Sequence, residues 1–351
     1  MSRHRGLRLR PLASQVIVIT GATSGVGLST ARAAAVRGAR LVLAARNEDA
    51  LKAVCEDLSG KGAQVAYVPA DVGREADVRA IAAVAVSRFG GFDTWINNAG
   101  VCMIGALTET RLADHQRLFE TNYWGVVHGS LTAIEQFSSQ DGGGALINVG
   151  AAAAGDVGLP LQAAFSASKH AVKGFTNALR TELMAQGAPV SVTLIKPSAV
   201  DSPTGEHARN LSGARPYNPT GVYATPLVAQ AILYAAEHRV RELTVGGGGG
   251  FLALAALMAP AVTEPFLALG ARFSVKAARG ADSARIDNLH HAGHDLRERA
   301  FQTGVRESSL YAAAQMRPKA SLGLAALAAL GISLAFRLGA RRAAATSSDE
   351  S

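Results

Sequence analysis

Cysteine and aromatic residues are both scarce in this sequence of 351 residues, which contains 2 cysteines and 5% aromatic side chains. Cys55 and Cys102 alone cannot form the disulfide framework of a small secreted domain, and such sparse use of cysteine is typical of a reducing compartment. The formal net charge of +8 would suit nucleic acid, but no basic stretch is interleaved with aromatic side chains. We therefore expect no nucleic acid among the partners.

The chain also lacks the features of a secretory signal. Residues 1–13 form a basic arm without an apolar core, because the apolar residues at 16–19 already indicate a strand. Both this arm and the basic residues beyond an apolar stretch near the C-terminus suit the neighbourhood of an anionic membrane surface. We expect a cytoplasmic catalytic domain. The arginines concerned are Arg3, Arg5, Arg8, Arg10, Arg337, Arg341 and Arg342.

Short runs of Val, Ile and Leu alternate with longer alanine-rich stretches over residues 14–250. Their continuous hydrophobicity indicates burial on both faces, and the helical stretches between them predict a parallel sheet. We expect an α/β fold with a doubly wound seven-stranded parallel sheet, a Rossmann fold. The predicted strands are Gln15–Thr20, Ala39–Ala44, Gln64–Pro69, Thr94–Asn97, Ala145–Val149, Val190–Ile195 and Glu242–Val245.

Two further segments of this domain carry signals of their own. Residues 202–225 are rich in Pro, Gly and Asn, and a long loop in a compact domain is usually functional. We expect a lid over a substrate cleft, with a solvated connection as the alternative. The doubly wound pattern ends at a run of five glycines, Gly246 to Gly250.

The C-terminal part contains two apolar segments around a charged linker, which fills most of residues 251–319. Phe251–Val262 is interrupted by Pro260 and is too short to span a bilayer, so we expect a packing or interfacial helix. Residues 320–336 would form a helix of about 25 Å, just below the ~30 Å hydrocarbon core. We therefore treat residues 320–340 as a candidate membrane helix followed by a polar tail at 341–351. A monotopic anchor and a soluble Ala/Leu helix stay open.

A glycine-rich turn from Thr20 to Gly27 follows the first predicted strand and opens the first helix. Glycines at 21, 25 and 27 permit a tight turn and a close approach of the backbone to a pyrophosphate, whose charge suits the helix N-terminus. Because the turn stands between a Val/Ile strand and an alanine-rich helix, it predicts a dinucleotide site.

The order of the motifs resembles the short-chain dehydrogenase/reductase family over about residues 14 to 250. The turn has the family's Thr-Gly-x-x-x-Gly-x-Gly form. The other matching features are Asn97-Asn98-Ala99-Gly100 after the fourth strand, Asn122 at the position of the family's helix asparagine, Pro160-Leu161-Gln162 ahead of the segment Phe165 to Lys169, and the loop Pro197 to Ser202, which looks like the one that covers the nicotinamide.

The resemblance implies a bound nicotinamide dinucleotide. Arg46 stands after the second strand, where an acidic residue would bind the ribose of NAD, so NADP(H) is the preferred cofactor and NAD(H) the second choice. The alternative for Arg46 is a solvated surface residue. Asp71-Val72 resembles the family's adenine contact. The predicted cofactor residues are Gly21, Thr23, Ser24, Gly25, Val26, Gly27, Arg46, Asp71, Val72, Asn98, Ala99, Lys169, Pro197, Ser198, Val200 and Ser202.

The same resemblance casts doubt on the activity. In the family, a tyrosine exchanges the substrate's proton, a lysine lowers the pKa of that tyrosine, a serine polarises the oxygen and an asparagine orders a water relay. Asn122 and Lys169 match, but Phe165 stands for the tyrosine and Ala152 for the serine. The stretch from Gly150 to Gly155 has no hydroxyl, so a shift of one residue cannot restore the serine.

Nearby side chains are poor substitutes for the missing acid. Ser166, Ser168 and His170 should point away from the helix face shared by residues 165 and 169, and Tyr123 is rotated similarly from Asn122. The ammonium of Lys169, acting through water, remains as a candidate acid.

A histidine cluster near the C-terminus could suggest a metal site. His290, His291 and His294 precede Asp295, but no glutamate of a zinc-protease pattern accompanies them. We expect a solvated helix face and no metal.

Two functions follow from the sequence. The first is an NADP(H)-dependent oxidoreductase acting on the hydroxyl or carbonyl group of a lipophilic substrate. The second is a catalytically impaired pseudoenzyme that binds nucleotide and acts as a membrane-associated scaffold or redox sensor. Association of the chain into a homo-oligomer is left open.

Overall fold

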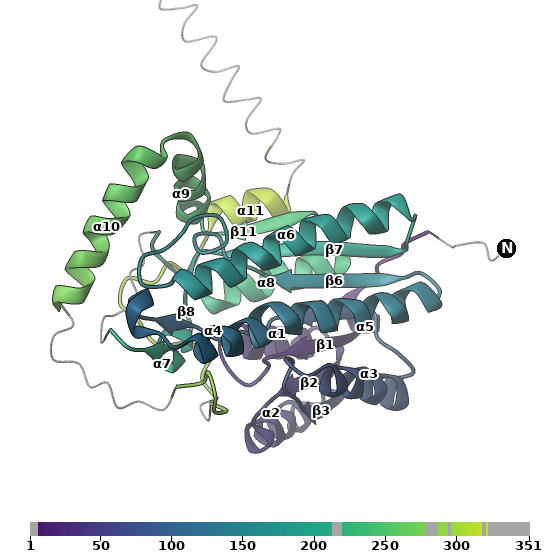
Figure 1. Ribbon diagram of the computed structural model, residues 1–351. Helices are drawn as coiled ribbons and strands as arrows, with labels where there is room; N and C mark the ends of the chain where they lie inside the picture. Colours follow the sequence, from purple (N-terminus) through teal and green to yellow (C-terminus); the bar gives the residue numbers. More distant parts are fainter. Residues whose placement is uncertain (1–5, 213–219, 278–286, 294–295, 318–320, 322–351) are drawn as a thin grey trace, which may run out of the picture.

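A computed structural model describes residues 6–212, 220–277, 287–293, 296–317 and 321. Its centre is a seven-stranded parallel sheet in the order β11-β7-β6-β4-β1-β2-β3, with helices on both faces (Figure 1). The doubly wound sheet predicted from the sequence is thus confirmed, and each predicted strand lies within two residues of its position. The strands are β1 Val16–Thr20, β2 Arg40–Ala45, β3 Val65–Pro69, β4 Thr94–Asn97, β6 Gly144–Val149, β7 Val190–Pro197 and β11 Glu242–Val245.

The continuous apolar runs are buried because each strand supplies both layers of the core. In β1, Ile17 and Ile19 face one layer, while Val16 and Val18 face the other. These successive side chains alternate between the two faces of the sheet, yet all of them are apolar, as expected of a strand that is covered on both sides. The first layer lies under α1 (Gly25–Val36), α2 (Glu48–Gly60) and α8 (Thr225–Glu237), and the second under α3 (Glu75–Phe89), α5 (Gly125–Ser139) and α6 (Ala163–Ala185).

The strand order reverses between β1 and β4, and at such a point the connections leave in opposite directions and open a crevice. Polar residues join β4 and β6 below this crevice. Asn97 donates to Asn148 Oδ1 at 2.9 Å, and Asn148 donates to Thr176 Oγ1 at 3.0 Å. The helix that brings Asn122 to this region continues from α4 (Leu112–Phe119) through one π turn, Glu120–Trp124. Such π turns occur frequently at functional sites.

The predicted lid at residues 202–225 has more structure than the expected loop. It contains α7 (Thr204–His207) and β9 (Arg209–Asn210), which pairs with β5 (Met103–Ile104). It ends in β10 (Val222–Ala224), which pairs with β8 (Ala199–Asp201). Residues 213–219 lie outside the described part.

The glycine run does not end the folded domain at residue 250, because it forms the first turn of α9 (Gly247–Met258). The helix needs small residues there: a Cβ on Gly249 would lie 2.5 Å from Ser198 Oγ, and one on Gly248 would lie 2.5 Å from the carbonyl oxygen of Thr220. The interruption predicted at Pro260 is confirmed, because α9 ends at Met258. Pro260 begins a second helix, α10 (Pro260–Ala277), at a position that tolerates proline.

The charged stretch expected to be a linker packs on the domain instead. Residues 287–293 and 296–307, here named the C-terminal strap, are followed by α11 (Leu310–Met316). Arg306 of the strap pairs with β10 through backbone bonds to Val222 and Ala224. The side chain of Gln315 bonds both the N–H and the carbonyl of Thr244, which covers the edge strand β11.

The described members of the histidine cluster, His290 and His291, are not in a helix. His290 lies in a turn, and its Nε2 is 2.9 Å from Oδ1 of the buried Asp114. The solvated helix face predicted there is therefore wrong for His290, because a buried carboxylate attracts it. His294 and Asp295 lie outside the described residues. Within the described part, no group of three or more His, Cys, Asp and Glu side chains is placed to hold a metal ion.

No helix among the described residues is both long and apolar enough to cross a bilayer. The candidate membrane helix at 320–340 lies outside the described residues apart from Ser321. Its role stays a prediction.

Candidate active site

A cavity of about 340 Å³ lies at the carboxyl ends of the central strands, between the glycine turn, the lid and the strap. Most of the residues predicted from the sequence line it, although Gly27, Asn122 and Ala152 do not. Those that line it are Gly21, Thr23, Ser24, Gly25, Val26, Arg46, Asp71, Val72, Asn98, Ala99, Phe165, Lys169, Pro197, Ser198, Val200 and Ser202. The geometry brings them together, while their roles toward a cofactor remain predictions.

The glycine turn is held against β4 by Asn98. Its Nδ2 donates to the carbonyls of Thr20 and Gly21 at 2.9 and 3.2 Å, and its own N–H donates to Thr20 Oγ1 at 3.0 Å. A Cβ on Gly27 would lie 2.1 Å from the carbonyl oxygen of Gly21, and one on Gly21 would lie 2.8 Å from Cα of Ala99. The turn therefore requires glycine at both positions. Gly27 acts beneath the turn and does not face the cavity.

The N-terminus of α1 opens toward the cavity. Ser24 precedes the helix in an extended conformation, and its side chain makes no capping hydrogen bond. The N–H of Gly25 donates to the carbonyl of Arg297 in the strap at 2.9 Å. The Gly25 N–H is thus already bonded. The other N–H groups at a helix start favour anions, so this end of α1 suits a phosphate group.

At the other end of the cleft, Arg46 is not the solvated surface residue considered as the alternative. Its guanidinium is half-buried and donates to the backbone carbonyls of Asn288 and Leu289. Burial, and next the neighbouring Arg117, lower the pKa of Arg46 from its usual value. Arg117 forms an ion pair with Asp71 and donates to the same Leu289 carbonyl at 3.2 Å.

Lys169 is buried on α6 and faces the cavity. Its Nζ donates to the carbonyl of Val149 at 3.0 Å. Burial lowers the pKa of Lys169 to about 8, and the adjacent Cys102 opposes this weakly. Burial also raises the pKa of the Cys102 thiol to about 12, so this thiol is neutral and a poor proton donor.

Phe165 presents a ring where the tyrosine is expected. Its centroid is 5.8 Å from Nζ of Lys169, within the range of a cation–π contact, and both residues line the cavity. A phenol at this position would bring a hydroxyl to the same wall. The ring supplies apolar surface only.

The two alanines around the predicted serine position differ in their exposure to the cavity. Ala151 lines the cavity, whereas Ala152 is fully buried, and a Cβ on Gly249 would lie 2.6 Å from Cβ of Ala152. Ala152 therefore faces the start of α9. The assignment of Ala152 to the serine position stays a prediction, and Ala151 is the neighbouring alanine that lines the cavity.

Both polar atoms of the Asn122 side chain form hydrogen bonds within the protein. Its Oδ1 accepts from the N–H of Val101 at 2.8 Å, and its Nδ2 donates to the Val101 carbonyl and to Ser168 Oγ, each at 3.0 Å. Neither Ser168 nor Ser166 lines the cavity, and Ser166 Oγ accepts from the N–H of Leu159. Tyr123 packs its ring edge-on against Phe175.

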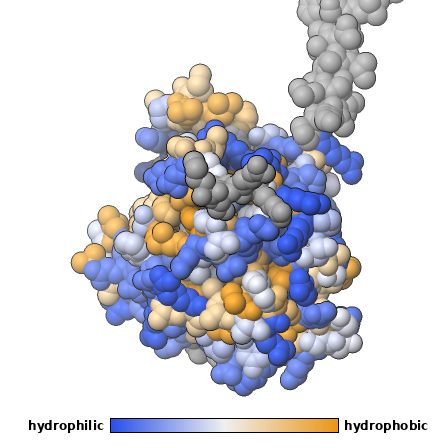
Figure 2. Space-filling model, turned by 90° about the vertical axis from the view of Figure 1, so that its right-hand side faces the viewer, coloured by the Kyte–Doolittle hydropathy of each residue, from blue (hydrophilic) through white to orange (hydrophobic). Residues whose placement is uncertain are grey.

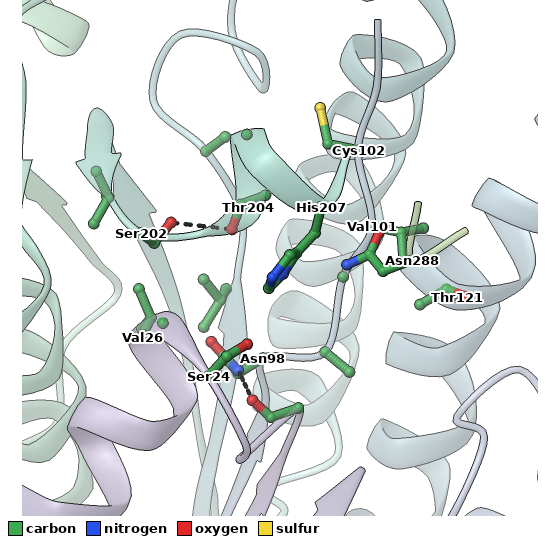
Figure 3. Close-up of a pocket in the computed structure, with 18 of the residues that line it drawn as sticks. Ser24, Val26, Asn98, Val101, Cys102, Thr121, Ser202, Thr204, His207 and Asn288 are labelled. Carbon is green, nitrogen blue, oxygen red and sulfur yellow. Dashed lines mark hydrogen bonds between the residues drawn. The ribbon is translucent and has the colours of Figure 1, made fainter. Parts of the chain in front are cut away.

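Sequence reasoning missed several polar residues of the cavity. Figure 3 shows His207 reaching into it from α7 toward Ser24 and Asn98. The signal for His207 and for Thr220 was their place in the expected lid. No signal marked the residues of the strap, which lie beyond the part of the chain that resembles the family. The missed polar lining residues are Asn47, Cys102, Thr121, Gln162, Thr204, His207, Thr220, Asn288 and Gln302.

Comparisons with known proteins agree with this geometry. The family model described as short chain dehydrogenase matches residues 15–211. The uncharacterized oxidoreductase YxnA of Bacillus subtilis (strain 168) is 41% identical over 322 residues, which cover 91% of this chain and 90% of that protein. Dehydrogenase/reductase SDR family member 7B of Danio rerio is 34% identical over 255 residues, covering 69% of this chain and 81% of that protein. The chain therefore belongs to the short-chain dehydrogenase/reductase family.

Two solved structures show the same fold. One is a short chain dehydrogenase/reductase from Burkholderia phymatum in complex with NAD, which has a TM-score of 0.60 and 29% identity and covers 70% of this chain and 90% of its own. The other is an alcohol dehydrogenase from the archaeon Thermococcus sibiricus complexed with 5-hydroxy-NADP, with a TM-score of 0.58, 25% identity, and coverage of 66% and 96%.

The lowered pKa of Lys169 predicts a pH-dependent stability. The unfolded chain has the ordinary lysine pKa of about 10.4, so between about pH 8 and 10 the native state binds fewer protons than the unfolded state, and stability from this group rises with pH. From pH 7 to 10, the free energy of unfolding of the wild type should rise by on the order of 1–3 kcal/mol relative to that of Lys169→Met. Urea unfolding at several pH values measures this difference in the free energy of unfolding between the wild type and the variant. The exposed Lys61→Met control should show little change, and a constant gap for Lys169→Met would contradict the assignment.

Proposed function

We propose that the protein is an NADP(H)-binding oxidoreductase that acts on a hydroxyl or carbonyl group of a lipophilic substrate, with impaired proton transfer. The observation that carries this proposal is a single cavity that joins the glycine turn, Arg46 and Lys169 to an apolar wall. When bound, the nicotinamide would supply or accept a hydride. The apolar wall consists of Val101, Ala153, Ala154, Leu159 and Phe165.

The residues present fit a dinucleotide. Gly21 and Gly25 leave room that a side chain would fill, since a Cβ on Gly25 would lie 3.3 Å from Cβ of Ser202. The start of α1 offers N–H groups to phosphate, and Arg46 brings a positive charge to the end of β2. Lys169 lines the same cavity, where its ammonium would hold a ribose hydroxyl.

Proton transfer is where the site is weak. Lys169 is a buried ammonium with a pKa lowered to about 8, so it is a stronger acid than a free lysine while still protonated at pH 7. The rate of carbonyl reduction through this ammonium would fall as pH rises above about 8, because the acid loses its proton. Loss of a positioned general acid costs ~10²–10⁴ in rate.

A second candidate function is a nucleotide-dependent scaffold or redox sensor without turnover. It is favoured by Phe165 and Ala151, which bring no hydroxyl to the wall where the family's acid and oxygen-polarising groups would stand. The two candidates share cofactor binding and differ in catalysis, so restoring the hydroxyls separates them.

We expect the double variant Phe165→Tyr with Ala151→Ser to raise NADPH-dependent reduction by at least ~10²-fold, because it restores a phenol beside Lys169 and a hydroxyl on the cavity wall. NADPH oxidation is measured against a panel of aldehydes, ketones and quinones. The matched control is Phe165→Tyr with Ala152→Ser, which adds the same hydroxyl one residue away, outside the cavity, and should behave like Phe165→Tyr alone. Robust wild-type turnover that is abolished by Lys169→Ala would instead establish lysine as the acid and rule out a pseudoenzyme.

Cofactor choice provides a separate test. NADPH should bind more tightly than NADH, because the guanidinium of Arg46 suits a 2′-phosphate; a charge-assisted bond of about 1.5–3 kcal/mol corresponds to a preference of roughly 10- to 100-fold. Arg46→Asp should narrow or invert this preference in calorimetric titrations. Arg239→Asp, which changes the same charge in an exposed loop, should not. Equal affinity of the wild type for both cofactors would contradict the assignment.

We further propose that the protein associates with a membrane through residues 320–340 while the catalytic domain stays on the cytoplasmic side. The described structure adds an apolar surface on α9 and α10, whose turn projects at the top of Figure 1 and is hydrophobic in Figure 2. The inner side of this pair packs Leu252 and Leu267 over Ala153 and Val157, beside the apolar wall of the cavity. Its outer side chains, each more than half exposed, are Phe251, Leu254, Leu257, Met258, Val262, Phe266 and Leu269.

A chain that ends at Ser321 should lose most of its binding to phospholipid vesicles, because it keeps α11 and removes the apolar segment. Flotation of the full chain and of the shortened chain measures the difference. Val262→Glu with Phe266→Glu, placed on the exposed face, should reduce whatever binding remains. A full chain that fractionates entirely as soluble without detergent would show that the anchor is absent.

A further inference from the structure

The C-terminal strap forms one side of the cavity that we assign to the dinucleotide. Its backbone carbonyls accept hydrogen bonds from the residues around the phosphate and ribose positions: Gly25 N–H donates to Arg297, Asn47 Nδ2 donates to Gly293 at 2.8 Å, and Arg46 donates to two carbonyls at the start of the strap. The strap residues that line the cavity are Asn288, Ala292, Gly293 and Gln302.

Buried charges fix the strap in this place. Asp201 of β8 is fully buried and accepts from Arg299 Nε at 2.7 Å and from the N–H of Gln302 at 3.0 Å. Asp287 pairs with Arg209 at 2.9 Å, and Arg209 also contacts the fully buried Asp114. Because an unpaired buried carboxylate is costly, these pairs disfavour release of the strap.

Two buried oxygens on one side of the cavity have no hydrogen-bond partner among the described residues, namely Oδ1 of Asn288 and Oγ1 of Thr121. Figure 3 shows both side chains near Val101, on the opposite side of the cavity from Ser202 and Val26. Buried polar atoms without a partner are rare and costly, so two on one wall point to a hydrogen-bonding ligand.

Asp71, the adenine contact expected from the family, is already engaged. Its Oδ1 accepts from the N–H of Gly73 at 3.0 Å, and its Oδ2 is paired with Arg117. Arg117 in turn donates to the strap carbonyl of Leu289. Both oxygens of Asp71 thus already accept from protein donors, whereas Oδ1 of Asn288 has no donor among the described residues.

We propose that the strap is part of the adenosine site, with the carboxamide of Asn288 as the hydrogen-bonding group for the adenine edge and the strap carbonyls as the positioning groups for Arg46. This inference rests on the proposed dinucleotide binding. A carboxamide is complementary to adenine, whose amino group donates while its ring nitrogens accept. The alignment with YxnA extends over 322 residues and covers 91% of this chain. The residues left outside it are fewer than those that follow the strap, so the alignment extends across the strap.

Calorimetric titration of the full chain tests the inference with three ligands: NADPH, adenosine 2′,5′-bisphosphate and reduced nicotinamide mononucleotide. Asn288→Leu should weaken NADPH and the bisphosphate by roughly 5- to 30-fold, the range of one hydrogen bond, and leave the mononucleotide unchanged. The melting temperature without ligand should hold or rise, because the lost oxygen has no partner in the protein. Thr121→Val, which also removes an unpartnered oxygen, should weaken the bisphosphate in the same sense.

His291→Leu, an exposed change three residues further along the strap, is the matched control and should bind all three ligands as the wild type does. Wild-type affinity of both Asn288→Leu and Thr121→Val for the bisphosphate would overturn the inference and leave the proposed function standing. Equal loss for the mononucleotide together with a lowered melting temperature would assign Asn288 a structural role and also overturn it. A wild type that binds neither NADPH nor NADH would remove the proposed function itself.

Discussion

The close approach of the glycine turn to the end of β4 is the constraint on which the site depends. Thr20 Oγ1 accepts from the N–H groups of Asn98 and Ala99, while the Asn98 amide returns bonds to the turn. These bonds fix the distance between β1 and β4 where the strand order reverses. Gly27 lets the first turn of α1 lie against Gly21, so the helix start points into the crevice. A side chain at Gly27 would push the helix away from the turn, and one at Gly21 would push the turn away from Ala99.

Much of this could be predicted from the sequence, because the relevant signals are local. Strands buried on both faces are continuous apolar runs in the sequence, and a glycine turn between such a strand and a helix is typical of a dinucleotide site. The sequence-based predictions failed where one local pattern is compatible with two structures. Glycines usually interrupt regular secondary structure. Gly248 and Gly249 are nevertheless needed inside α9, because Thr220 and Ser198 lie so close to them. Likewise, the sequence alone does not show that Ala151 lines the cavity while Ala152 does not, because this depends on the direction of the chain after β6.

The strap could not be predicted because its interactions are long-range and polar. Its charges pair with residues far away in sequence, as Arg299 does with Asp201 and Arg32 with Glu298. A charged stretch usually indicates a solvated segment, and most exposed ion pairs contribute ~0–1 kcal/mol. The difference here is burial at one partner: Asp201 and Asp114 are fully buried and require their cations. The burial of a carboxylate on β8 therefore determines where the strap lies, and nothing in the strap's own composition shows it.

Binding and proton transfer depend on separate parts of this site. The proposed dinucleotide site consists of backbone groups, glycines and the strap, none of which involves residue 165. The ammonium of Lys169 is kept by the Val149 carbonyl and the face of the Phe165 ring, so its position does not require a phenol. A lysine held without its tyrosine still presents a positive charge of lowered pKa at the end of the cavity. Under the proposed function, the absence of the two hydroxyls would therefore lower the rate of proton transfer and leave in place the groups that would hold a nicotinamide ribose.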